Sequence, residues 1–328
     1  MSEKVNLFNY ATSELSQDAF IAWLLAWADS KQEGPMHHFG LKFVKYIYDA
    51  CKMPIPDTTR VEIEEQTDNI DVKCKINGNE LILIEDKAGT VQHSDQLKRY
   101  LEAMKRSGYF QILPVYIQTR DQSDYSKVYD NGYAVITRRD LLDFFNDNAD
   151  LQQQAQNQIL DDFVEYIKNI ERSVQSYKIR ALNDWIWDSW IGFYQELQKR
   201  LGEGNWSYVA NPSGGFLGFW WRWCGNDDGE QYLQLEEQRL CIKICCETKE
   251  KSREVMYKYR EHFVAEGKKH GFEISRPARL RAGIYTTVAI LDGYRKTDVS
   301  GRIDMADTVK FLQQFGDFFN NAVSLVND

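Results

Sequence analysis

Residues 68–100 read DNIDVKCKINGNELILIEDKAGTVQHSDQLKRY, and this stretch decides the fold. Within it, residues 70–76 alternate between apolar and polar side chains, as expected of a strand with one buried face. Residues 80–87 are apolar on both faces until the strand ends in charged residues, as expected of a central strand. Asn77-Gly78 between the two runs is a typical hairpin turn. The stretch therefore predicts a pair of antiparallel strands, the second buried in the middle of a sheet.

Asp71 on the first strand and Glu85 on the second are the candidate catalytic carboxylates. The predicted hairpin brings them together, and neighbouring carboxylates repel each other and favour a bound cation. Hard oxygen ligands suit Mg²⁺ or Mn²⁺, and we expect the backbone carbonyl of Asp86 to be a further ligand. Lys87 lies on the same face as Glu85, where its ammonium would orient an attacking water and stabilise charge on a phosphate. This order of residues indicates a metal-dependent phosphodiesterase site.

A helix is predicted to follow, capped by Ser94 and ending near residue 106. Gln96 and Tyr100 lie one turn apart beside its apolar stripe, so we expect them to contact the attacking water or the phosphate backbone. For Tyr100, packing against the core is the alternative. His93 lies close by, but a lone histidine is more often structural, and we assign it no role.

Asp68 competes with Asp71 for the place of the first carboxylate. Asp68-Asn69 is typical of a turn, whereas Asp71 lies inside the alternating strand, so we prefer Asp71. An E-x-K triplet alone is usually a solvated strand edge. Here it ends a strand that is apolar on both faces, which favours the catalytic interpretation of Glu85 and Lys87.

The rest of the first half predicts an α/β fold, with a mixed sheet core flanked by helices. Ser16 is placed as the N-cap of an apolar helix, with Asp18 in its first turn. Expected helices are 17–29 and 39–51, expected strands are 60–66, 110–119 and 133–136, and Thr137 with Asp140 predicts a capping box that opens another helix.

The second half predicts a separate α+β domain with an antiparallel sheet. Long helices are expected at 151–172 and 176–201, followed by aromatic strands, a helix at 249–269, strands near 274 and at 282–291, and a helix at 305–323. The chain is thus expected to divide into a nuclease-like domain at 1–172, a connecting helix at 173–204 and a C-terminal domain at 205–328. We expect the C-terminal domain to bind substrate, sense an effector or mediate dimerisation, and a homodimer is left open.

Two features of the C-terminal half bear on binding. A cluster of aromatic residues is compatible with base stacking, although a sheet core is the more common use of such residues. A basic excess between residues 275 and 302 is compatible with a surface for nucleic acid or another anionic ligand. The aromatic residues are Phe216, Phe219, Trp220, Trp221 and Trp223, and the basic residues are Arg276, Arg279, Arg281, Arg295, Lys296 and Arg302.

The composition of the whole chain disfavours several classes of protein. A formal net charge of -9 over 328 residues argues against a protein that coats nucleic acid non-specifically. The same net charge is compatible with a local basic groove. The six cysteines are scattered and form no CxxC pair, which disfavours a zinc site or a disulfide framework. The N-terminal residues lack the pattern of a leader segment, and the sequence has no apolar run long enough to span a membrane, so we expect a soluble cytoplasmic protein.

The motif D-x13-E-x-K followed by Q-L-x-x-Y resembles the PD-(D/E)XK nuclease superfamily. The resemblance covers roughly the first half of the chain and is nearest to a bacterial group with an N-terminal helix of the type SELSQDAFIAWLL and an I-E-D-K strand. It implies that Asp71, Glu85 and Lys87 form the catalytic core, supported by the Q-x-x-x-Y helix. In that superfamily an acidic residue on the N-terminal helix often adds a metal ligand, which points to Glu14. Stabilising the helix dipole is the alternative role for Glu14.

The residues and the resemblance together predict a Mg²⁺- or Mn²⁺-dependent nuclease that hydrolyses phosphodiester bonds, with DNA favoured over RNA. The resemblance implies a role in bacterial or phage defence or in DNA processing. The alternative is a non-catalytic module that retains the nuclease fold and binds nucleic acid or protein.

Overall fold

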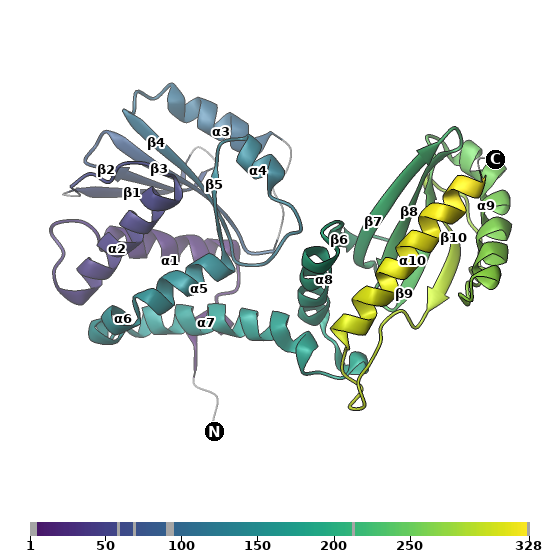
Figure 1. Cartoon of the computed structure of the whole chain (residues 1–328). Helices are drawn as coiled ribbons and strands as arrows, with labels where there is room; N and C mark the ends of the chain where they lie inside the picture. Colours follow the sequence, from purple (N-terminus) through teal and green to yellow (C-terminus); the bar gives the residue numbers. More distant parts are fainter. Residues whose placement is uncertain (1–4, 58–59, 68–69, 90–94, 212–213, 327–328) are drawn as a thin grey trace. The chain divides into compact units, whose positions relative to one another are not determined.

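The computed structural model describes residues 5–57, 60–67, 70–89, 95–211 and 214–326. Contacts divide the chain into two compact units, Met1–Arg172 and Ser173–Asp328 (Figure 1). The sequence interpretations that concern Asp68, Asn69, His93 and Ser94 lie outside the described residues.

The first unit is built on a five-stranded mixed sheet with the strand order β1-β2-β3-β4-β5. β1, β2 and β3 are antiparallel to one another, and β3, β4 and β5 are parallel. Asn77, Gly78 and Asn79 join β2 to β3, and the first two have the positive φ that a tight hairpin turn requires. This sheet with its flanking helices confirms the predicted α/β fold. The strands are β1 (Val61–Thr67), β2 (Ile70–Ile76), β3 (Glu80–Lys87), β4 (Gln111–Gln118) and β5 (Ala134–Thr137).

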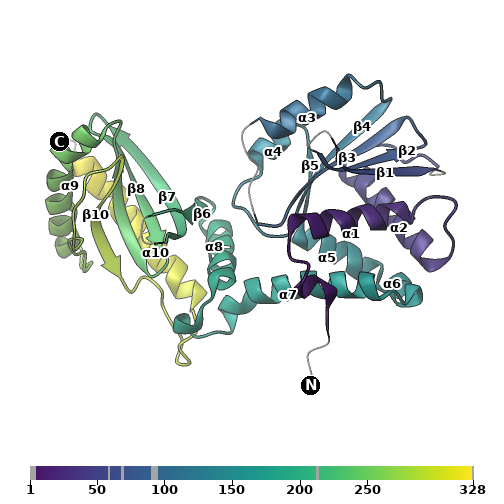
Figure 2. The ribbon, with the colours of Figure 1, turned by 180° about the vertical axis from the view of Figure 1, so that it is seen from behind.

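Helices cover both faces of this sheet (Figures 1 and 2). The first face packs on α1, α2 and α5, and the second on α3 and α4. Toward α3, Leu81 and Leu83 of β3 join Leu97 and Met104 in a buried apolar cluster, so the alternate residues of β3 face α1. The helices of this unit are η1 (Leu7–Asn9), α1 (Glu14–Ala26), α2 (Gly34–Ala50), α3 (Gln96–Lys105), α4 (Ser126–Asp130), α5 (Arg138–Asp147), α6 (Ala149–Ala155) and α7 (Gln158–Gln175).

The start of α1 corrects the sequence interpretation. Ser13, not Ser16, is the N-cap, because Ser13 has the extended backbone of a cap residue and the helix begins at Glu14. Ser16 lies inside the helix, where its hydroxyl contacts that of Ser13. The earlier start places Glu14 in the first turn of α1.

Other helix boundaries also differ from expectation. The helix expected at 39–51 begins earlier, because Pro35 is compatible with the first turn of a helix. The single helix expected at 151–172 is divided into α6 and α7, since Gln156 has a left-handed backbone that ends α6. The capping box of Thr137 and Asp140 is confirmed at the start of α5.

The prediction of a single connecting helix at 173–204 is wrong. The chain instead ends α7, passes through the short helices η2 (Ser176–Lys178) and η3 (Leu182–Asp184), and then forms α8 (Trp187–Leu201). A Cβ atom on Gly192 of α8 would come within 2.0 Å of the carbonyl oxygen of Val174. The close approach that this glycine permits lets α8 pack back against the end of α7 instead of continuing it.

The second unit confirms the predicted α+β arrangement with an antiparallel sheet. Its strand order is β10-β9-β8-β7-β6, and every neighbouring pair is antiparallel. The strand expected near residue 274 is reduced to a bridge between Ser275 and Ile290. The elements are β6 (Asn205–Val209), β7 (Phe216–Asn226), β8 (Gly229–Glu236), β9 (Arg239–Cys245), β10 (Tyr285–Asp292), α9 (Lys249–Lys269) and α10 (Met305–Val326).

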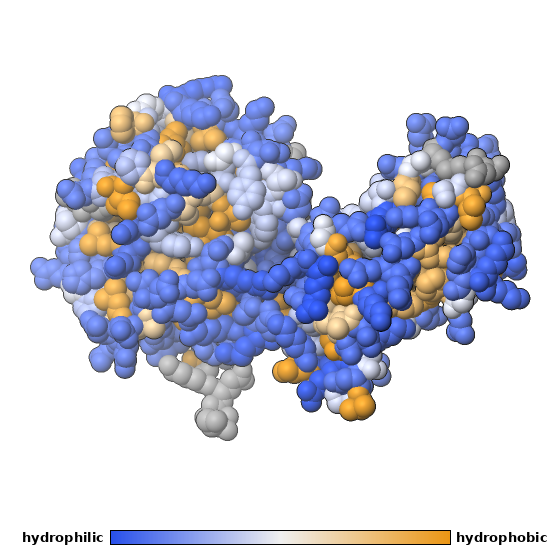
Figure 3. Space-filling view, in the orientation of Figure 1, coloured by the Kyte–Doolittle hydropathy of each residue, from blue (hydrophilic) through white to orange (hydrophobic). Residues whose placement is uncertain are grey.

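The surface seen in the orientation of Figure 1 is largely hydrophilic, with apolar residues in scattered patches (Figure 3). Charged and polar side chains cover most of both units on this side. Within the described part of the chain, no helix combines the length and the apolar character needed to cross a membrane.

Candidate active site

The pairing of β2 with β3 brings Asp71 and Glu85 to the same end of the hairpin. Val72 pairs with Ile84, and in an antiparallel pair the next two residues, Asp71 and Glu85, then lie opposite each other. Asp71 Oδ2 also accepts a hydrogen bond of 2.8 Å from the backbone N–H of Asp86. The first carboxylate is thus attached directly to the strand that carries the second.

The ammonium of Lys87 lies among the acidic side chains. Its Nζ is 2.7 Å from Glu85 Oε1, 3.7 Å from Asp71 Oδ2 and 3.9 Å from Glu14 Oε2. The same ammonium donates a hydrogen bond of 2.8 Å to the carbonyl oxygen of Asp86. Only 9% of the Lys87 side chain is exposed, so these contacts replace most of its hydration.

Glu14 reaches this cluster from the first turn of α1. Its Oε1 accepts a hydrogen bond of 3.2 Å from the backbone N–H of Ala88, directly after β3. The side chain is partly exposed and faces Lys87. Glu14 is therefore both an acidic residue at a helix N-terminus and a neighbour of the other candidate residues.

Gln96 and Tyr100 approach from α3 on the face that β3 shares with that helix. Gln96 Nε2 lies 2.9 Å from Glu85 Oε1 and 3.0 Å from the Tyr100 hydroxyl. Leu97, between them in sequence, is buried in the apolar cluster and fixes the helix against the sheet. Gln96 thus links Glu85 to Tyr100, which also packs against the cluster.

Burial and neighbouring charge shift the acid–base properties of this site. Burial, and next the negative charge of Asp71, raise the pKa of Glu85 to about 7, although Lys87 opposes the shift. Burial would lower the pKa of Lys87, but the hydrogen bond to Glu85 and the charges of Asp71 and Glu14 outweigh it, so that pKa is raised. Lys87 therefore keeps its proton at neutral pH.

The second oxygen of Glu85 marks a place for a cation. Oε2 is buried and has no hydrogen-bond partner among the described residues. A buried carboxylate oxygen without a donor is costly unless a ligand satisfies it. Side-chain oxygens of Asp71, Glu85 and Glu14 with the Asp86 carbonyl form the hard, all-oxygen donor set that suits Mg²⁺ or Mn²⁺.

The acidic groups are arranged around the lysine. Among the described residues, no group of three or more His, Cys, Asp or Glu side chains is already gathered closely enough to hold a metal. The Lys87 ammonium lies between the carboxylates, and the Asp86 carbonyl accepts its hydrogen bond. Binding a cation would therefore require Lys87 to give up part of these contacts.

The side chain of Asp86 points to the opposite face of β3, an arrangement that sequence reasoning missed. It accepts a hydrogen bond from Gln17 of α1, and Thr119 Oγ1 in turn donates one of 2.7 Å to Gln17. The carboxyl of Asp18, also on α1, lies close enough for its charge to act on Asp86. The parity of the strand could have indicated this, since Asp86 alternates with Glu85 and follows Ile84 on the face toward α1.

The acid pair is buried, and its pKa values reflect that. Burial, and next the charge of Asp18, raise the pKa of Asp86 well above its ordinary value. Burial, and next the charge of Asp71, raise the pKa of Asp18 to about 7. The first-turn position predicted for Asp18 is wrong, because α1 begins at Glu14 and Asp18 lies one turn further along the helix.

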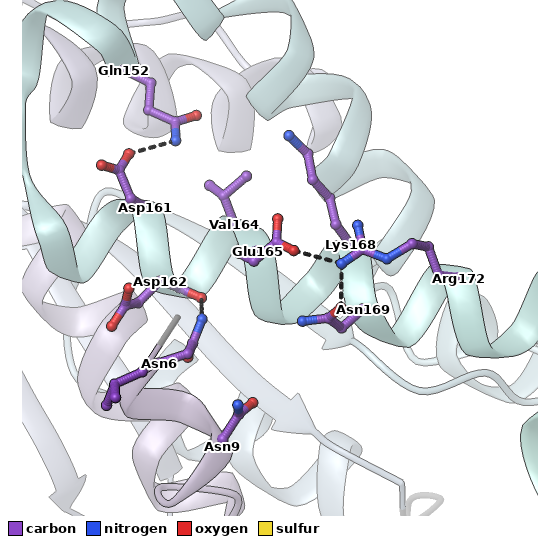
Figure 4. A pocket seen from close by; sticks show the side chains of 11 residues that line it. Asn6, Asn9, Gln152, Asp161, Asp162, Val164, Glu165, Lys168, Asn169 and Arg172 are labelled. Atoms are coloured by element: carbon purple, nitrogen blue, oxygen red, sulfur yellow. Dashed lines mark hydrogen bonds and ion pairs between the residues drawn. The ribbon is translucent and has the colours of Figure 1, made fainter. Parts of the chain in front are cut away.

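A separate hollow of about 590 Å³ on the first unit contains none of these residues (Figure 4). It is lined by the segment before α1 together with α6 and α7. Asn6 Nδ2 donates a hydrogen bond of 2.7 Å to the carbonyl of Asp162, and Asp162 Oδ2 accepts one of 2.9 Å from the N–H of Leu7. These bonds attach the N-terminal segment to α7, which helps to place α1 and its Glu14.

Comparison with known proteins gives one match. Residues 5–181 match the family described as the PD-(D/E)XK nuclease superfamily. No curated protein and no solved structure matches the chain. Because the match covers more than half of the sequence and includes every candidate site residue, the chain belongs to the PD-(D/E)XK nuclease superfamily.

Proposed function

We propose that the first unit is a divalent-metal-dependent nuclease that hydrolyses phosphodiester bonds in nucleic acid, with DNA preferred over RNA. The observation that carries the proposal is the convergence of Asp71, Glu85 and Lys87 at the end of β3. Membership of a superfamily of nucleases supports it. The proposed setting is bacterial or phage defence or DNA processing.

The metal would be Mg²⁺ or Mn²⁺, held by Asp71, Glu85 and the Asp86 carbonyl, with Glu14 as a further ligand. The buried, unsatisfied Oε2 of Glu85 supports this assignment. When bound, such an ion activates water and neutralises charge on a phosphate oxygen.

The residues of the chain supply the remaining parts of the reaction. Lys87, protonated because its pKa is raised, would hold the attacking water by donating a hydrogen bond and would stabilise negative charge on the phosphate. A protonated lysine is an electrostatic catalyst and not a general base. Gln96 would keep Glu85 in place through its bond to Oε1. The exposed basic residues Lys98 and Arg99 of α3 lie next to this face and are available to contact the nucleic-acid backbone.

A cleavage assay with paired variants tests the proposal. Glu85→Gln and Lys87→Ala are compared with Glu102→Gln and Lys105→Ala, because Glu102 and Lys105 form an exposed ion pair in the same unit. Plasmid DNA, single-stranded DNA and RNA are incubated with Mg²⁺ or Mn²⁺. We expect each site variant to lose at least about a hundredfold in cleavage rate, because a metal ligand or the main electrostatic group is removed. We expect the control variants to cleave as wild type does.

Two results would contradict the proposal. If Glu85→Gln and Lys87→Ala cleave as fast as wild type, the activity arises elsewhere. If the folded wild-type protein cleaves none of the substrates with either ion, the chain acts as a binding module that retains the nuclease fold.

A further inference from the structure

The sheet of the second unit has one face that no described helix covers. Phe219 of β7 lies in ring contact with Tyr194 of α8, and α9 and α10 pack on the same side of the sheet. α10 lies in front of the strands in Figure 1 and behind them in Figure 2, so Figure 2 looks toward the other face. We call this other side the open sheet face. It includes Trp223, Tyr232 and Lys243.

A β-bulge in β7 turns an aromatic residue toward the open sheet face. The register between β7 and β8 shifts between Trp221 and Cys224, and Arg222 has a left-handed backbone with φ 57°. Strand alternation alone would put Trp221 and Trp223 on the same side. Trp221 is buried beside Phe219 on the helix side, whereas Trp223 stacks on Tyr232 of the opposite face, with ring centroids 4.0 Å apart. The bulge therefore presents Trp223 outward.

The bulge is held in place from the helix side. Arg222 pairs with Glu203 at 3.1 Å and with Asp317 of α10 at 3.5 Å. A left-handed backbone is unfavourable for arginine, and bulges of this kind often re-aim a side chain at a functional site. The outer side of Trp223 stays accessible, since 44% of the residue is exposed. Tyr285 at the other end of the same face is also exposed and meets the edge of Tyr232.

Polar groups lie among these aromatic rings. The Tyr232 hydroxyl contacts Gln234 Oε1 at 3.4 Å, Gln234 Nε2 donates to Glu236 Oε1 at 3.1 Å, and Lys243 Nζ donates to the same oxygen at 2.9 Å. Gln234 and Lys243 are buried although no helix covers them. An interface for an apolar partner gains nothing from a buried ion pair. These buried polar groups instead hold Tyr232 beneath the exposed ring of Trp223.

Arginines lie at the rim of the open sheet face. A hollow of about 560 Å³ is lined by Arg239 of β9 and Arg279 of the loop before β10, together with the acidic residues Glu236 and Asp292. Arg239 and Arg279 are exposed, and no carboxylate in the described part of the chain forms an ion pair with either. Each therefore offers a guanidinium to a phosphate, and Arg239 lies at the end of β9 opposite to the residue that pairs with Tyr285.

We infer that the open sheet face binds single-stranded nucleic acid. Bases stack on the outer side of Trp223 and on Tyr285, and Arg239 and Arg279 contact phosphates. In a duplex the bases are already stacked and paired, so their faces cannot reach the rings. The site does not depend on cleavage by the first unit.

Binding of labelled oligonucleotides to the full chain tests this site. Fluorescence anisotropy is measured in EDTA with a single strand of about 20 nucleotides, the matching duplex and free mononucleotides as competitors. Trp223→Ala is compared with Trp187→Ala, because Trp187 of α8 is equally exposed, at 43%. Arg279→Glu is compared with Arg253→Glu on α9, another exposed arginine. Circular dichroism and the melting temperature establish that each variant is folded.

We expect Trp223→Ala to weaken single-strand binding about tenfold, as the loss of one stacked base does. Arg279→Glu should weaken it and flatten its dependence on salt, because a phosphate contact is lost. Both controls should bind as wild type does. Unchanged single-strand affinity in folded Trp223→Ala and Arg279→Glu would overturn the inference. So would equal affinity for free mononucleotides, which would make the ligand a nucleotide, or a dimer that Trp223→Ala dissociates without altering nucleic-acid binding.

Discussion

Glu85 and Asp86 are neighbours on β3, yet they lie in two different regions of the first unit. Both are buried, and burial raises the pKa of both. Glu85 faces α3 and contacts Lys87 and Gln96, with its Oε2 left unsatisfied among the described residues. Asp86 faces α1 and is enclosed by Gln17 and Asp18.

The difference shows that a perturbed pKa does not by itself identify a catalytic residue. Structural networks shift pKa values as strongly as active sites do. What separates the two residues is their surroundings. Each carboxyl has one buried oxygen without a hydrogen-bond partner among the described residues. Glu85, however, lies beside the Lys87 ammonium and next to Asp71, whereas Asp86 accepts a hydrogen bond from Gln17 and so joins α1 to β3. One side of the strand carries the proposed chemistry and the other side holds the fold together.

The strongest test of this comparison replaces the carboxylate by the matching amide on each face of β3, in Asp86→Asn and in Glu85→Gln. We expect Asp86→Asn to cleave DNA within about tenfold of wild type, because its side chain does not face the proposed metal and its backbone carbonyl is retained. Glu85→Gln should lose at least about a hundredfold. The measurement is the initial rate of plasmid cleavage in Mg²⁺ for both variants and wild type. A loss in Asp86→Asn as large as that in Glu85→Gln would break the division into a chemical face and a structural face.

A second test uses the dependence of stability on pH in metal-free buffer. The pKa values of Asp18 and Glu85 are raised to about 7, and that of Asp86 is raised well above its ordinary value. Below about pH 4 these groups are protonated in both the folded and the unfolded chain, so they cost no stability. Between about pH 4 and about 7 the unfolded chain releases these protons and the folded chain keeps them. The free energy of unfolding therefore falls as the pH rises through this window.

Asp86→Asn removes one of these acids and should make the fall shallower. We expect the variant to gain stability relative to wild type as the pH is raised from about 5 to about 8. Urea unfolding in EDTA at several pH values measures this gain. Glu102→Gln is the control, since Glu102 is exposed on the surface of α3. A difference between Asp86→Asn and wild type that does not change with pH would mean that Asp86 is ionised in the folded protein.

Local patterns in the sequence were enough to place the main site residues. Asp71, Glu85 and Lys87 follow from strand alternation and from the Asn77-Gly78 turn, because both depend on neighbours in the chain. Gln96 follows from helical spacing in the same way. The sheet arrangement and the α+β nature of the second unit were also predicted, since the elements that form them are strongly patterned.

The features that were missed depend on contacts between distant parts of the chain or on unusual backbone. Asp86 meets Asp18 only because α1 packs across the sheet, and no spacing in the sequence encodes that contact. The cap of α1 was misplaced because Ser13 and Ser16 are equally suitable by type. The bulge at Arg222 has no sequence signal, since arginine rarely adopts a left-handed backbone. For that reason Trp223 could not be separated from the buried aromatic residues around it.

The smallest expected effect concerns the link between Glu85 and α3. Gln96→Ala removes the hydrogen bond to Glu85 Oε1 but leaves Lys87 and both carboxylates in place. We therefore expect a loss of about tenfold in cleavage rate, well below that of Glu85→Gln, because a hydrogen bond to a carboxylate contributes about 1.5 kcal/mol. Tyr100→Phe should lose less, since Tyr100 touches Gln96 and not Glu85. Cleavage rates in Mg²⁺, with exposed Gln153→Ala on α6 as the control, measure both. A hundredfold loss in Gln96→Ala would instead make Gln96 part of the catalytic core, and no loss would leave α3 with a packing role alone.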